Sequence, residues 1–202
     1  IAAQRLATQS DGNEIVIDDD SDIVPVEVVS IEDGGVGDRV CVDLTSVLEV
    51  GEGLLIGSSS NALALIHGET LESEFVPPRP FRVNAGAVHA YVLMDDGSTK
   101  YLSELSAGDS VSVCNSDGIV RSAVIGRMKI ESRPFLLVRF NHPESGIVGQ
   151  TFLQQAETVR LISPIGEMPS VTSITVGDLL LARIGSSARH IGQTVLSVAE
   201  ER

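Results

Sequence analysis

The sequence has no tryptophan, and aromatic residues make up only 3% of its 202 residues. Little is therefore available to build a stacking platform for nucleic-acid bases or sugars. Basic residues are also scarce, because 14 Lys and Arg stand against 28 Asp and Glu, for a net charge of −14. Nucleic acids and anionic membranes both attract basic surfaces, so this balance argues against either as a partner.

Cysteine is rare as well, and the two residues present, Cys41 and Cys114, each lie in an apolar, strand-like run. Two thiols do not form a disulfide framework, so we expect both to be reduced and buried. No apolar run approaches the length of a transmembrane helix. No two of the four histidines stand at metal-ligand spacing, and we expect no metal site.

The hydrophobic content of 43% is enough for a packed core, and from Val24 onward its pattern is typical of β-strands. Asp96-Gly97 and Asp117-Gly118 each separate two strand-like runs, which is a strong signal for a β-hairpin. We predict a mainly β domain over residues 23–202, built of antiparallel hairpins as a small barrel or sandwich. A division into halves 23–115 and 116–202 is left open. Helices should be few and short, at 44–49 and 153–157.

A Gly-Asp pair followed by an alternating apolar run recurs along the chain, at Gly37-Asp38, Gly108-Asp109 and Gly177-Asp178, with Gly51-Glu52 as a degenerate copy. Glycine suits a tight turn, and the aspartate can accept hydrogen bonds from nearby backbone amides. We interpret the repeat as a structural turn that precedes a strand, without a catalytic role. We also interpret Gly51-x-Gly53-x-x-x-Gly57 as turn glycines. A dinucleotide loop requires a long helix after it, and no long helix follows here.

The segment before the β-rich part has a different texture. Residues 1–8 are typical of the end of a helix, residues 15–17 of a short strand, and residues 18–22 hold four aspartates. This acidic run lacks the spacing and the glycine of a calcium loop, so we interpret it as a solvated linker. The chain starts at Ile1 without a signal or transit pattern, and we expect it to begin inside a longer precursor or after a removed segment.

Polar and apolar residues are interleaved in the stretch RPFRVNAGAVHAY at residues 79–91. In an extended chain Arg82 and Asn84 share one face, and His89 and Tyr91 share another beyond the bend that Gly86 permits. Guanidinium groups suit a carboxylate or phosphate, an amide can orient a hydroxyl, and an imidazole can transfer protons. This pattern fits a site for an anionic, hydroxylated small molecule, although a half-exposed strand pair would show the same periodicity.

The same stretch resembles the signature of the 3-dehydroquinate synthase II family, the archaeal-type enzyme of early aromatic biosynthesis. The similarity runs from about Val36 to the end of the chain. Two departures are that Leu44-Thr45 replaces a more polar, cysteine-containing pair, and that the N-terminal half of the family has no counterpart here. Residues 1–22 are accordingly expected to be the remnant of an α/β N-terminal part. The other matching segments are 37–43, 51–60, 101–109, 127–134, 156–161 and 188–192.

The resemblance implies an NAD-dependent enzyme that oxidatively deaminates and cyclises an amino-keto sugar acid to 3-dehydroquinate. His89 and Tyr91 are the expected catalytic residues. The expected substrate-binding residues are Arg79, Arg82, Asn84, Ser58, Ser59, Ser60, Lys129, Arg133 and His190. No nicotinamide-binding fold is visible in the sequence, so NAD would bind in the missing half or where the halves join.

A second interpretation is a non-catalytic interaction subunit of a larger assembly, because a fold can persist without its function. The intact signature favours catalysis, and the missing half favours the interaction subunit. The expected compartment is the cytoplasm, or the stromal side of a plastid if the source is an alga. Of the remaining histidines, His142 precedes a proline in a loop and is expected to be inert, whereas His67 ends an apolar run and its role is left open.

Overall fold

The computed structural model describes residues 23–73, 76–185, 189–190 and 193–194. The features expected in residues 1–22 lie outside this range. Within it, no helix is long and apolar enough to cross a membrane, and the one helix is a single 3₁₀ turn, η1 (Leu102–Glu104). The strands are β1 (Ile23–Leu44), β2 (Gly53–Ser59), β3 (Ala62–His67), β4 (Arg82–Ala87), β5 (Tyr91–Leu93), β6 (Thr99–Tyr101), β7 (Ser110–Cys114), β8 (Val120–Asn141), β9 (Val148–Gln154), β10 (Leu179–Ile184), β11 (Arg189–His190) and β12 (Gln193–Thr194).

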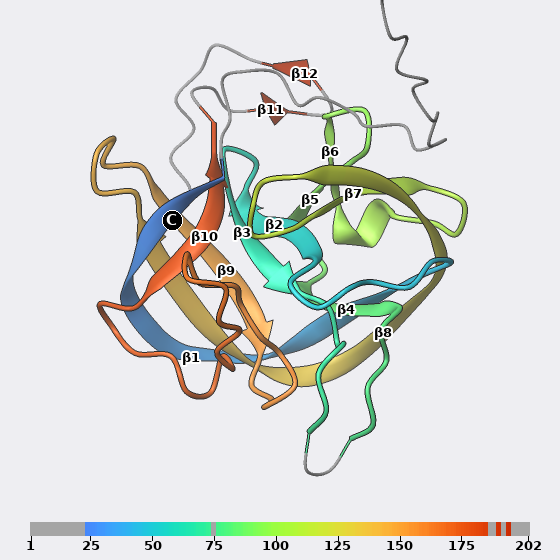
Figure 1. The fold of residues 1–202 in the computed structure, drawn as a ribbon, viewed down its shortest axis with the longest axis horizontal. Helices are drawn as coiled ribbons and strands as arrows, with labels where there is room; N and C mark the ends of the chain where they lie inside the picture. Colours follow the sequence, from blue (N-terminus) through green and yellow to red (C-terminus); the bar gives the residue numbers. More distant parts are fainter. Residues whose placement is uncertain (1–22, 74–75, 186–188, 191–192, 195–202) are drawn as a thin grey trace, which may run out of the picture.

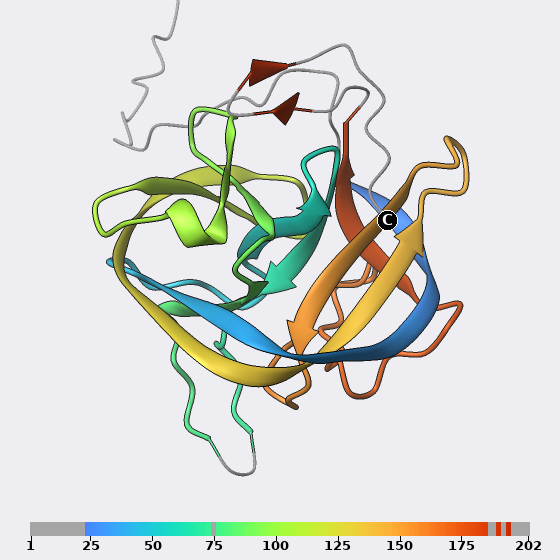
Figure 2. The same ribbon diagram turned by 180° about the vertical axis from the view of Figure 1, so that it is seen from behind.

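Two long strands, β1 and β8, form the frame of the molecule. They pair antiparallel along most of their length, and both views show them curving together beneath β2 and β3 (Figures 1 and 2). The ten-stranded sheet follows the order β3-β10-β1-β8-β7-β2-β5-β6, with a further pairing of β2 to β3. Strand β4 branches onto β1, and β9 onto β8, so the sheet is strongly curved without being a closed regular barrel. The prediction of a mainly antiparallel β fold is confirmed.

Alternation along the strands directs one set of side chains into a common core. Val26 and Val28 of β1 are fully buried, as the alternating pattern predicts, and they pack in one cluster with Leu54, Ile56 and Phe140. Strands from residues 23–115 and 116–202 contribute to the same sheet. Both cysteines are free and buried, as expected.

Both predicted hairpins are present, because β5 pairs with β6 and β7 pairs with β8 across the two Asp-Gly turns. The two predicted helices are wrong. In residues 44–49 the backbone amides of Leu44, Thr45 and Leu48 donate to carbonyls of Phe81, Val124 and Pro80, so long-range partners replace helical ones. Residues 153–154 belong to β9, where Leu153 pairs with Leu136 of β8.

The Gly-Asp repeat is a turn at three of its four positions. The carboxylates of Glu52, Asp109 and Asp178 each accept a hydrogen bond from the backbone amide three residues earlier, at 2.8–2.9 Å. The preceding glycines all have positive φ. Gly37-Asp38 differs, because Gly37 lies inside β1 and pairs with Arg133. Of the glycines interpreted as turn residues, Gly51 lies in a turn, whereas Gly53 and Gly57 lie within β2.

Candidate functional site

The strand register gathers the charged residues of β1, β4 and β8 on one face. Residues that pair across antiparallel strands point to the same side of the sheet. On β1, Arg39 pairs with Glu131, Cys41 pairs with Lys129, and Asp43 pairs with Arg127 of β8. On the other edge of β1, the β4 residues opposite Asp43 and Cys41 are Arg82 and Asn84. The predicted common face of Arg82 and Asn84 is therefore continued by charged residues from two further strands.

Gly86 makes this arrangement possible at the end of β4. Its φ is +115°, and a Cβ there would lie 2.5 Å from the carbonyl oxygen of Phe152. Any other residue would clash with β9 and strain the backbone. The register of β1 on β4 shifts nearby, between Val40 and Cys41. The positive φ of Gly86 thus allows β4 to lie close against β9, where Asn84 of β4 donates to Gln154 of β9.

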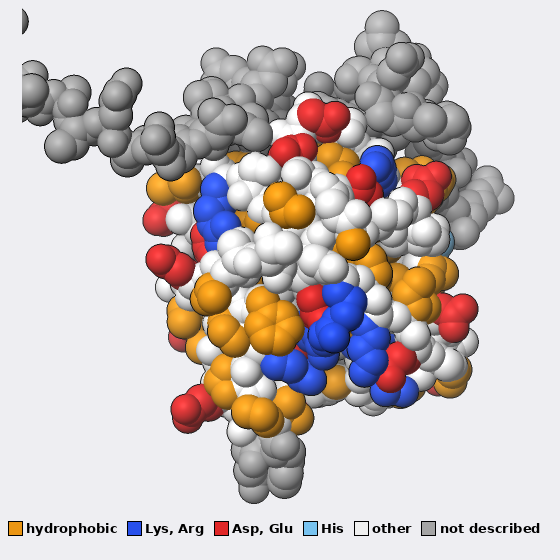
Figure 3. Space-filling model, turned by 90° about the vertical axis from the view of Figure 1, so that its right-hand side faces the viewer, with side chains coloured by type: hydrophobic (Ala, Val, Ile, Leu, Met, Phe, Trp, Pro, Cys, Tyr) orange, Lys and Arg blue, Asp and Glu red, His pale blue; other side chains and the backbone are white. Residues whose placement is uncertain are grey.

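A cleft of about 350 Å³, which we call the cationic cleft, opens on this face. Five of its side chains are Lys or Arg and three are Glu, so its walls carry an excess of two positive charges in a chain of net charge −14. Lys and Arg side chains gather visibly on one face of the molecule (Figure 3). Such a local excess concentrates small anions. The lining residues are Arg39, Glu69, Ser73, Val76, Arg79, Arg82, Asn84, Lys129, Glu131, Arg133, Gln154, Ala156, Glu157 and Thr158.

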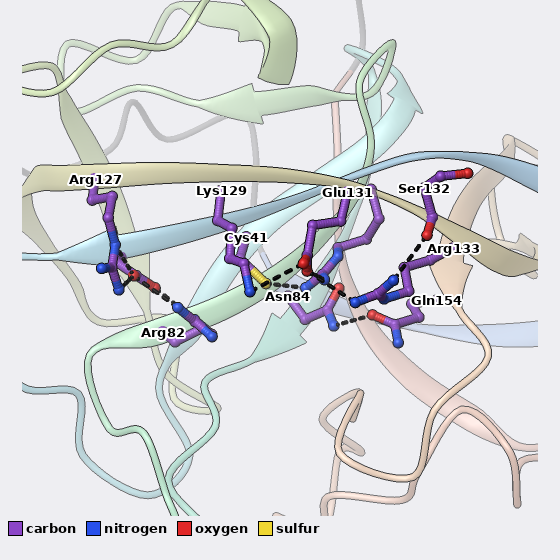
Figure 4. Close-up of polar contacts among 11 residues, drawn as sticks. Cys41, Arg82, Asn84, Arg127, Lys129, Glu131, Ser132, Arg133 and Gln154 are labelled. Atoms are coloured by element: carbon purple, nitrogen blue, oxygen red, sulfur yellow. Dashed lines mark hydrogen bonds and ion pairs between the residues drawn. The ribbon is translucent and has the colours of Figure 1, made fainter.

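Asp43 lies behind one end of the cleft and binds the lining residue Arg82 there. Figure 4 shows Arg82 and Arg127 close together at this end. Arg82 grips Asp43 with a two-pronged fork, Nε to Oδ1 at 2.6 Å and a terminal nitrogen to Oδ2 at 2.9 Å, and Arg127 Nε donates to Oδ2 at 2.8 Å. Burial alone would raise the pKa of Asp43, but hydrogen bonds from Arg82 and Arg127 outweigh it and lower the pKa. Asp43 therefore stays ionised and fixes Arg82 in place.

Glu131 is the centre of the other end, where three cations converge on one carboxylate (Figure 4). Its Oε2 lies 2.6 Å from a terminal nitrogen of Arg39 and 3.1 Å from one of Arg133, and its Oε1 lies 3.2 Å from Lys129 Nζ. The hydrogen bond from Lys129, with Arg133 and Arg39 nearby, lowers the pKa of Glu131. Its three partners are thus held together by an ionised side chain.

Two buried polar atoms in the wall of the cationic cleft have neither a hydrogen bond nor an ion pair among the described residues. They are Arg39 Nε and Asn84 Oδ1. The amide nitrogen of Asn84 is satisfied by Gln154 Oε1 at 2.8 Å, so its oxygen is the free end. Unsatisfied buried donors and acceptors are costly, and in native structures they commonly mark the place of a ligand or water.

A second opening of about 550 Å³, the aromatic cleft, lies beside the first. Tyr91 and Tyr101 stack with ring centroids 4.3 Å apart, and their hydroxyl oxygens are 2.5 Å apart. His89 meets Phe152 edge-on with centroids 5.1 Å apart. The aromatic cleft is lined by Ser58, His89, Tyr91, Tyr101, Leu137, Arg139, Gln150 and Phe152.

The two clefts are neighbours along β9. Gln150, Phe152 and Gln154 alternate along this strand and share its half-buried face. Gln150 and Phe152 line the aromatic cleft, and Gln154 lines the cationic cleft. Phe135 of β8 packs edge-on against Phe152, with the two ring centroids 6.3 Å apart. A ridge built on Phe152 therefore separates the clefts.

The structure divides the predicted site residues between these clefts. Arg79, Arg82, Asn84, Lys129 and Arg133 line the cationic cleft, whereas Ser58, His89 and Tyr91 line the aromatic cleft. Neither set of lining residues includes Ser59 or Ser60; Ser59 donates to Asn61 Oδ1 at 2.5 Å. His190 belongs to β11, and its side chain is outside the described part. The roles assigned to these residues remain predictions.

His89 lies in the turn that joins β4 to β5, where the amide of Ala90 donates to the carbonyl of Ala87. Its side chain is exposed at the mouth of the aromatic cleft, and partial burial lowers its pKa. A neutral imidazole at this position can accept a proton. His67 is different, because it is buried and its Nε2 accepts the backbone amide of Gly51 at 3.0 Å. We assign His67 a structural role.

Arg39, Asp43, Glu69 and Gln154 were not among the site residues predicted from the sequence. Arg39, Cys41 and Asp43 alternate in the run GDRVCVD, so a strand there places them on one face, and this signal was present in the sequence. Glu69 pairs with Arg79 Nε at 2.6 Å, and its pKa is raised by burial despite Arg79 and Arg82 nearby. Nothing local marks either Glu69 or Gln154: Glu69 enters the cleft through an isolated bridge to Arg79, and Gln154 enters it through the pairing of β9 with β8.

Comparison with known proteins decides the family. Residues 25–202 match the model of the 3-dehydroquinate synthase II C-terminal domain. The chain belongs to this family. A 3-dehydroquinate synthase of Methanosphaera stadtmanae is 46% identical over 199 residues, which cover 94% of this chain and 55% of that relative. The 3-dehydroquinate synthase of Methanothermobacter thermautotrophicus is 48% identical over 181 residues, covering 90% of this chain and 48% of that relative.

A third relative, the 3-dehydroquinate synthase of Methanocaldococcus jannaschii, is 47% identical over 175 residues and is covered to 48% of its length. The chain thus spans about half the length of the curated relatives it matches. The family resemblance stated from the sequence is confirmed, and both clefts lie within the matched domain.

Proposed function

We propose that this chain is the C-terminal part of an enzyme that makes 3-dehydroquinate. The substrate is 2-amino-3,7-dideoxy-D-threo-hept-6-ulosonate, which is oxidatively deaminated with NAD as the oxidant and then cyclised. The observation that carries the proposal is the cationic cleft, with its two unsatisfied buried polar atoms, in a domain of this family. A sugar acid brings the carboxylate and the hydroxyls that such a cleft would bind.

In this proposal the cationic cleft binds the substrate and the aromatic cleft carries out the proton transfers. The guanidinium and ammonium groups of the cationic cleft hold the substrate's carboxylate, and Asn84 orients a hydroxyl. His89 and Tyr91 face the reacting end from the aromatic cleft, where His89 accepts and returns the protons that deamination and ring closure move. Phe152 and Leu137 exclude water from that end.

The described residues do not fit the diphosphate of NAD. A dinucleotide site offers a glycine-rich loop at a helix N-terminus, and the described part of the chain has no α-helix. The one cation of the aromatic cleft, Arg139, is already bound to Glu32 and Gln150. We therefore derive no step through NAD on these residues, and the protein outside them would hold its phosphates.

The test is turnover by the natural protein at its complete length, supplied with the sugar acid and NAD, with 3-dehydroquinate as the measured product. We expect His89→Gln to fold and to bind substrate but to lose about 10²–10⁴-fold in kcat, the usual contribution of a positioned acid–base group. The matched control is His142→Gln, because His142 is in a loop and contacts Ser145 Oγ at 2.8 Å, away from either cleft. It should keep wild-type turnover.

No product from the wild-type protein would refute the proposed reaction. If product forms and folded His89→Gln keeps more than about a tenth of wild-type turnover, the loss is too small for proton transfer. His89 would then be reassigned to structure, and the reaction would stand. A protein that makes no product but co-purifies in a stable complex would support the interaction-subunit alternative.

A further inference from the structure

The cationic cleft contains an arginine whose carboxylate-binding edge is only half used. Arg82 and Arg39 lie on the same face of adjacent strands, but they differ in how many nitrogens of the guanidinium fork are bound. Arg82 uses both Nε and a terminal nitrogen to grip Asp43. Arg39 uses a terminal nitrogen on Glu131 Oε2, while its Nε is buried and without a hydrogen-bond partner among the described residues. The fork of Arg39 therefore has one arm unused and would be free for a bidentate carboxylate once Glu131 turned away, whereas both arms of the Arg82 fork are occupied.

The other cations of the cleft are less suited to this role. Arg79 Nε is taken by Glu69 at 2.6 Å. Lys129 is a point charge without a fork, and Arg133 sends a terminal nitrogen to the carbonyl of Ser132 at 3.0 Å. Arg39 is also firmly held, because it is buried and its remaining terminal nitrogen contacts Cys41 Sγ. A fixed fork loses little freedom when a ligand binds.

Glu131 stands where a ligand's carboxylate would stand. It is a carboxylate from the wall of the cleft itself, and it touches Arg39, Lys129 and Arg133 at once. Its side chain is 28% exposed, so it can turn outward to solvent. Asn84, opposite Cys41 on the adjacent strand, presents an unsatisfied buried oxygen to the same cleft. This oxygen can accept a hydrogen bond from a hydroxyl of the ligand.

We propose that Arg39 recognises the carboxylate of a hydroxy-carboxylic acid, that Asn84 Oδ1 accepts one of its hydroxyls, and that Glu131 holds the carboxylate's place until the ligand arrives. This inference rests on the proposed function and assigns the specificity of the same cleft. Arg39 binds the ligand directly, and Glu131 is a competing internal anion. Glu131 keeps the three cations in position and makes weakly binding anions compete with an ion pair already formed.

The test is calorimetric titration of the 202-residue chain with quinate, a ring that carries a carboxylate and several hydroxyls. Glu131→Gln should bind quinate about tenfold more tightly than wild type, because removing a charged competitor frees a charge-assisted hydrogen bond. The matched control is Glu157→Gln. Glu157 lines the same cleft and its removal changes the charge equally, but its partner is Arg160 at 3.6 Å. It should change affinity by less than about threefold, because its partner is not part of the fork.

Two further variants separate the fork from the charge. Arg39→Lys keeps the charge and loses the fork, so in the Glu131→Gln background it should weaken quinate at least about tenfold. Asn84→Ala should weaken quinate but leave cyclohexanecarboxylate, which has no hydroxyls, unchanged. Thermal melts check that each variant is folded. The methyl ester of quinate, which lacks the charge, should gain nothing from Glu131→Gln.

Equal effects of Glu131→Gln and Glu157→Gln would overturn the inference, because they would show that Glu131 affects quinate binding only through its negative charge and not through its contact with Arg39. Undiminished binding in Arg39→Lys, or no quinate binding by wild type and Glu131→Gln at millimolar concentrations, would overturn it as well. These results are independent of turnover. If the complete protein makes no 3-dehydroquinate but quinate binds as expected, the inference stands and the proposed reaction falls.

Discussion

Asp43 is the residue on which the charged face depends most. It is buried and is shared by Arg82, which is also buried, and Arg127, whose side chain is 64% exposed. A buried ion pair is not by itself a net source of stability, since desolvation opposes the attraction between the charges. Removing one member is costly, because the other is left buried and charged.

We therefore expect Asp43→Asn to lower the free energy of unfolding by about 3–5 kcal/mol, as is usual when a buried pair is broken. Urea denaturation measures this. Arg127→Gln removes the exposed partner of the same carboxylate and should cost at most about 1 kcal/mol. Equal losses in the two variants would show that burial does not distinguish the two arginines.

His67 gives a prediction for pH. Burial, with the positive charge of Arg160 nearby, lowers the pKa of His67 to about 4 from an ordinary 6.5. The unfolded chain then takes up a proton before the folded chain does, so the stabilisation is complete above pH 6.5 and is lost as the pH falls towards 4. The difference in pKa corresponds to about 3 kcal/mol.

Urea denaturation of wild type and His67→Gln between pH 7 and 4.5 tests this assignment. The interval lies above the ordinary range of carboxylates such as Asp43 and Glu52, whose lowered pKa values place their own losses at lower pH. Wild type should lose stability across the interval, and His67→Gln should lose clearly less. Parallel curves would mean that His67 takes up a proton in the folded protein as readily as in the unfolded chain.

At the level of single elements, the sequence predicted correctly those elements whose geometry depends on contacts between residues close together in the chain. The Asp-Gly hairpins are read correctly because the turn geometry depends on the two residues themselves. The helices expected at 44–49 and 153–157 fail because their amides bond to residues far away in the sequence. The length of β1 and β8 is also hidden, since Gly35 and Pro134 interrupt the pattern and are accommodated by register shifts.

The Gly-Asp turn supports a prediction about an element. Asp178 Oδ2 accepts the amide of Thr175 at 2.8 Å and satisfies a turn before β10. We expect Asp178→Ala to lower the free energy of unfolding by about 1 kcal/mol, the usual loss for a capping carboxylate. Asp38→Ala is the matched control, because Asp38 has the same local sequence but is exposed within β1. It should change stability by less than about 0.5 kcal/mol. Equal losses would contradict the turn role.

At the level of the whole molecule, the sequence indicates which residue types form the site, but it does not show how these residues are distributed between the two clefts. Arg82 and Asn84 are correctly placed on one face by strand alternation. Their separation from His89 and Tyr91 depends on β9, whose Phe152 lines the aromatic cleft and whose Gln154 lines the cationic cleft, and β9 is placed there through its pairing with β8. Likewise, the open fork of Arg39 depends on its register against Glu131. Neither relation is local, so no motif could show it.

The charge of the whole chain and the charge of the cleft have opposite signs. With a net charge of −14, most of the surface repels anions, and the cationic cleft is the place on the described part where Arg and Lys from β1, β4 and β8 converge. Binding of a small anion there should weaken as salt rises, because the excess charge is partly exposed to solvent. The cationic cleft is thus expected to attract small anions within an otherwise acidic molecule.

We propose above all that the cationic cleft holds a hydroxy-carboxylate substrate. The most direct measurement is a quinate titration of the ¹⁵N-labelled chain followed by NMR of side-chain and backbone signals. We expect the signals of the side-chain amides of Asn84 and Gln154 and of the Nε–H of Arg39 to shift together with one dissociation constant, at lower quinate concentrations than the signals of His89 and Tyr91. Shifts confined to the aromatic cleft, or scattered over the surface without a common dissociation constant, would contradict it.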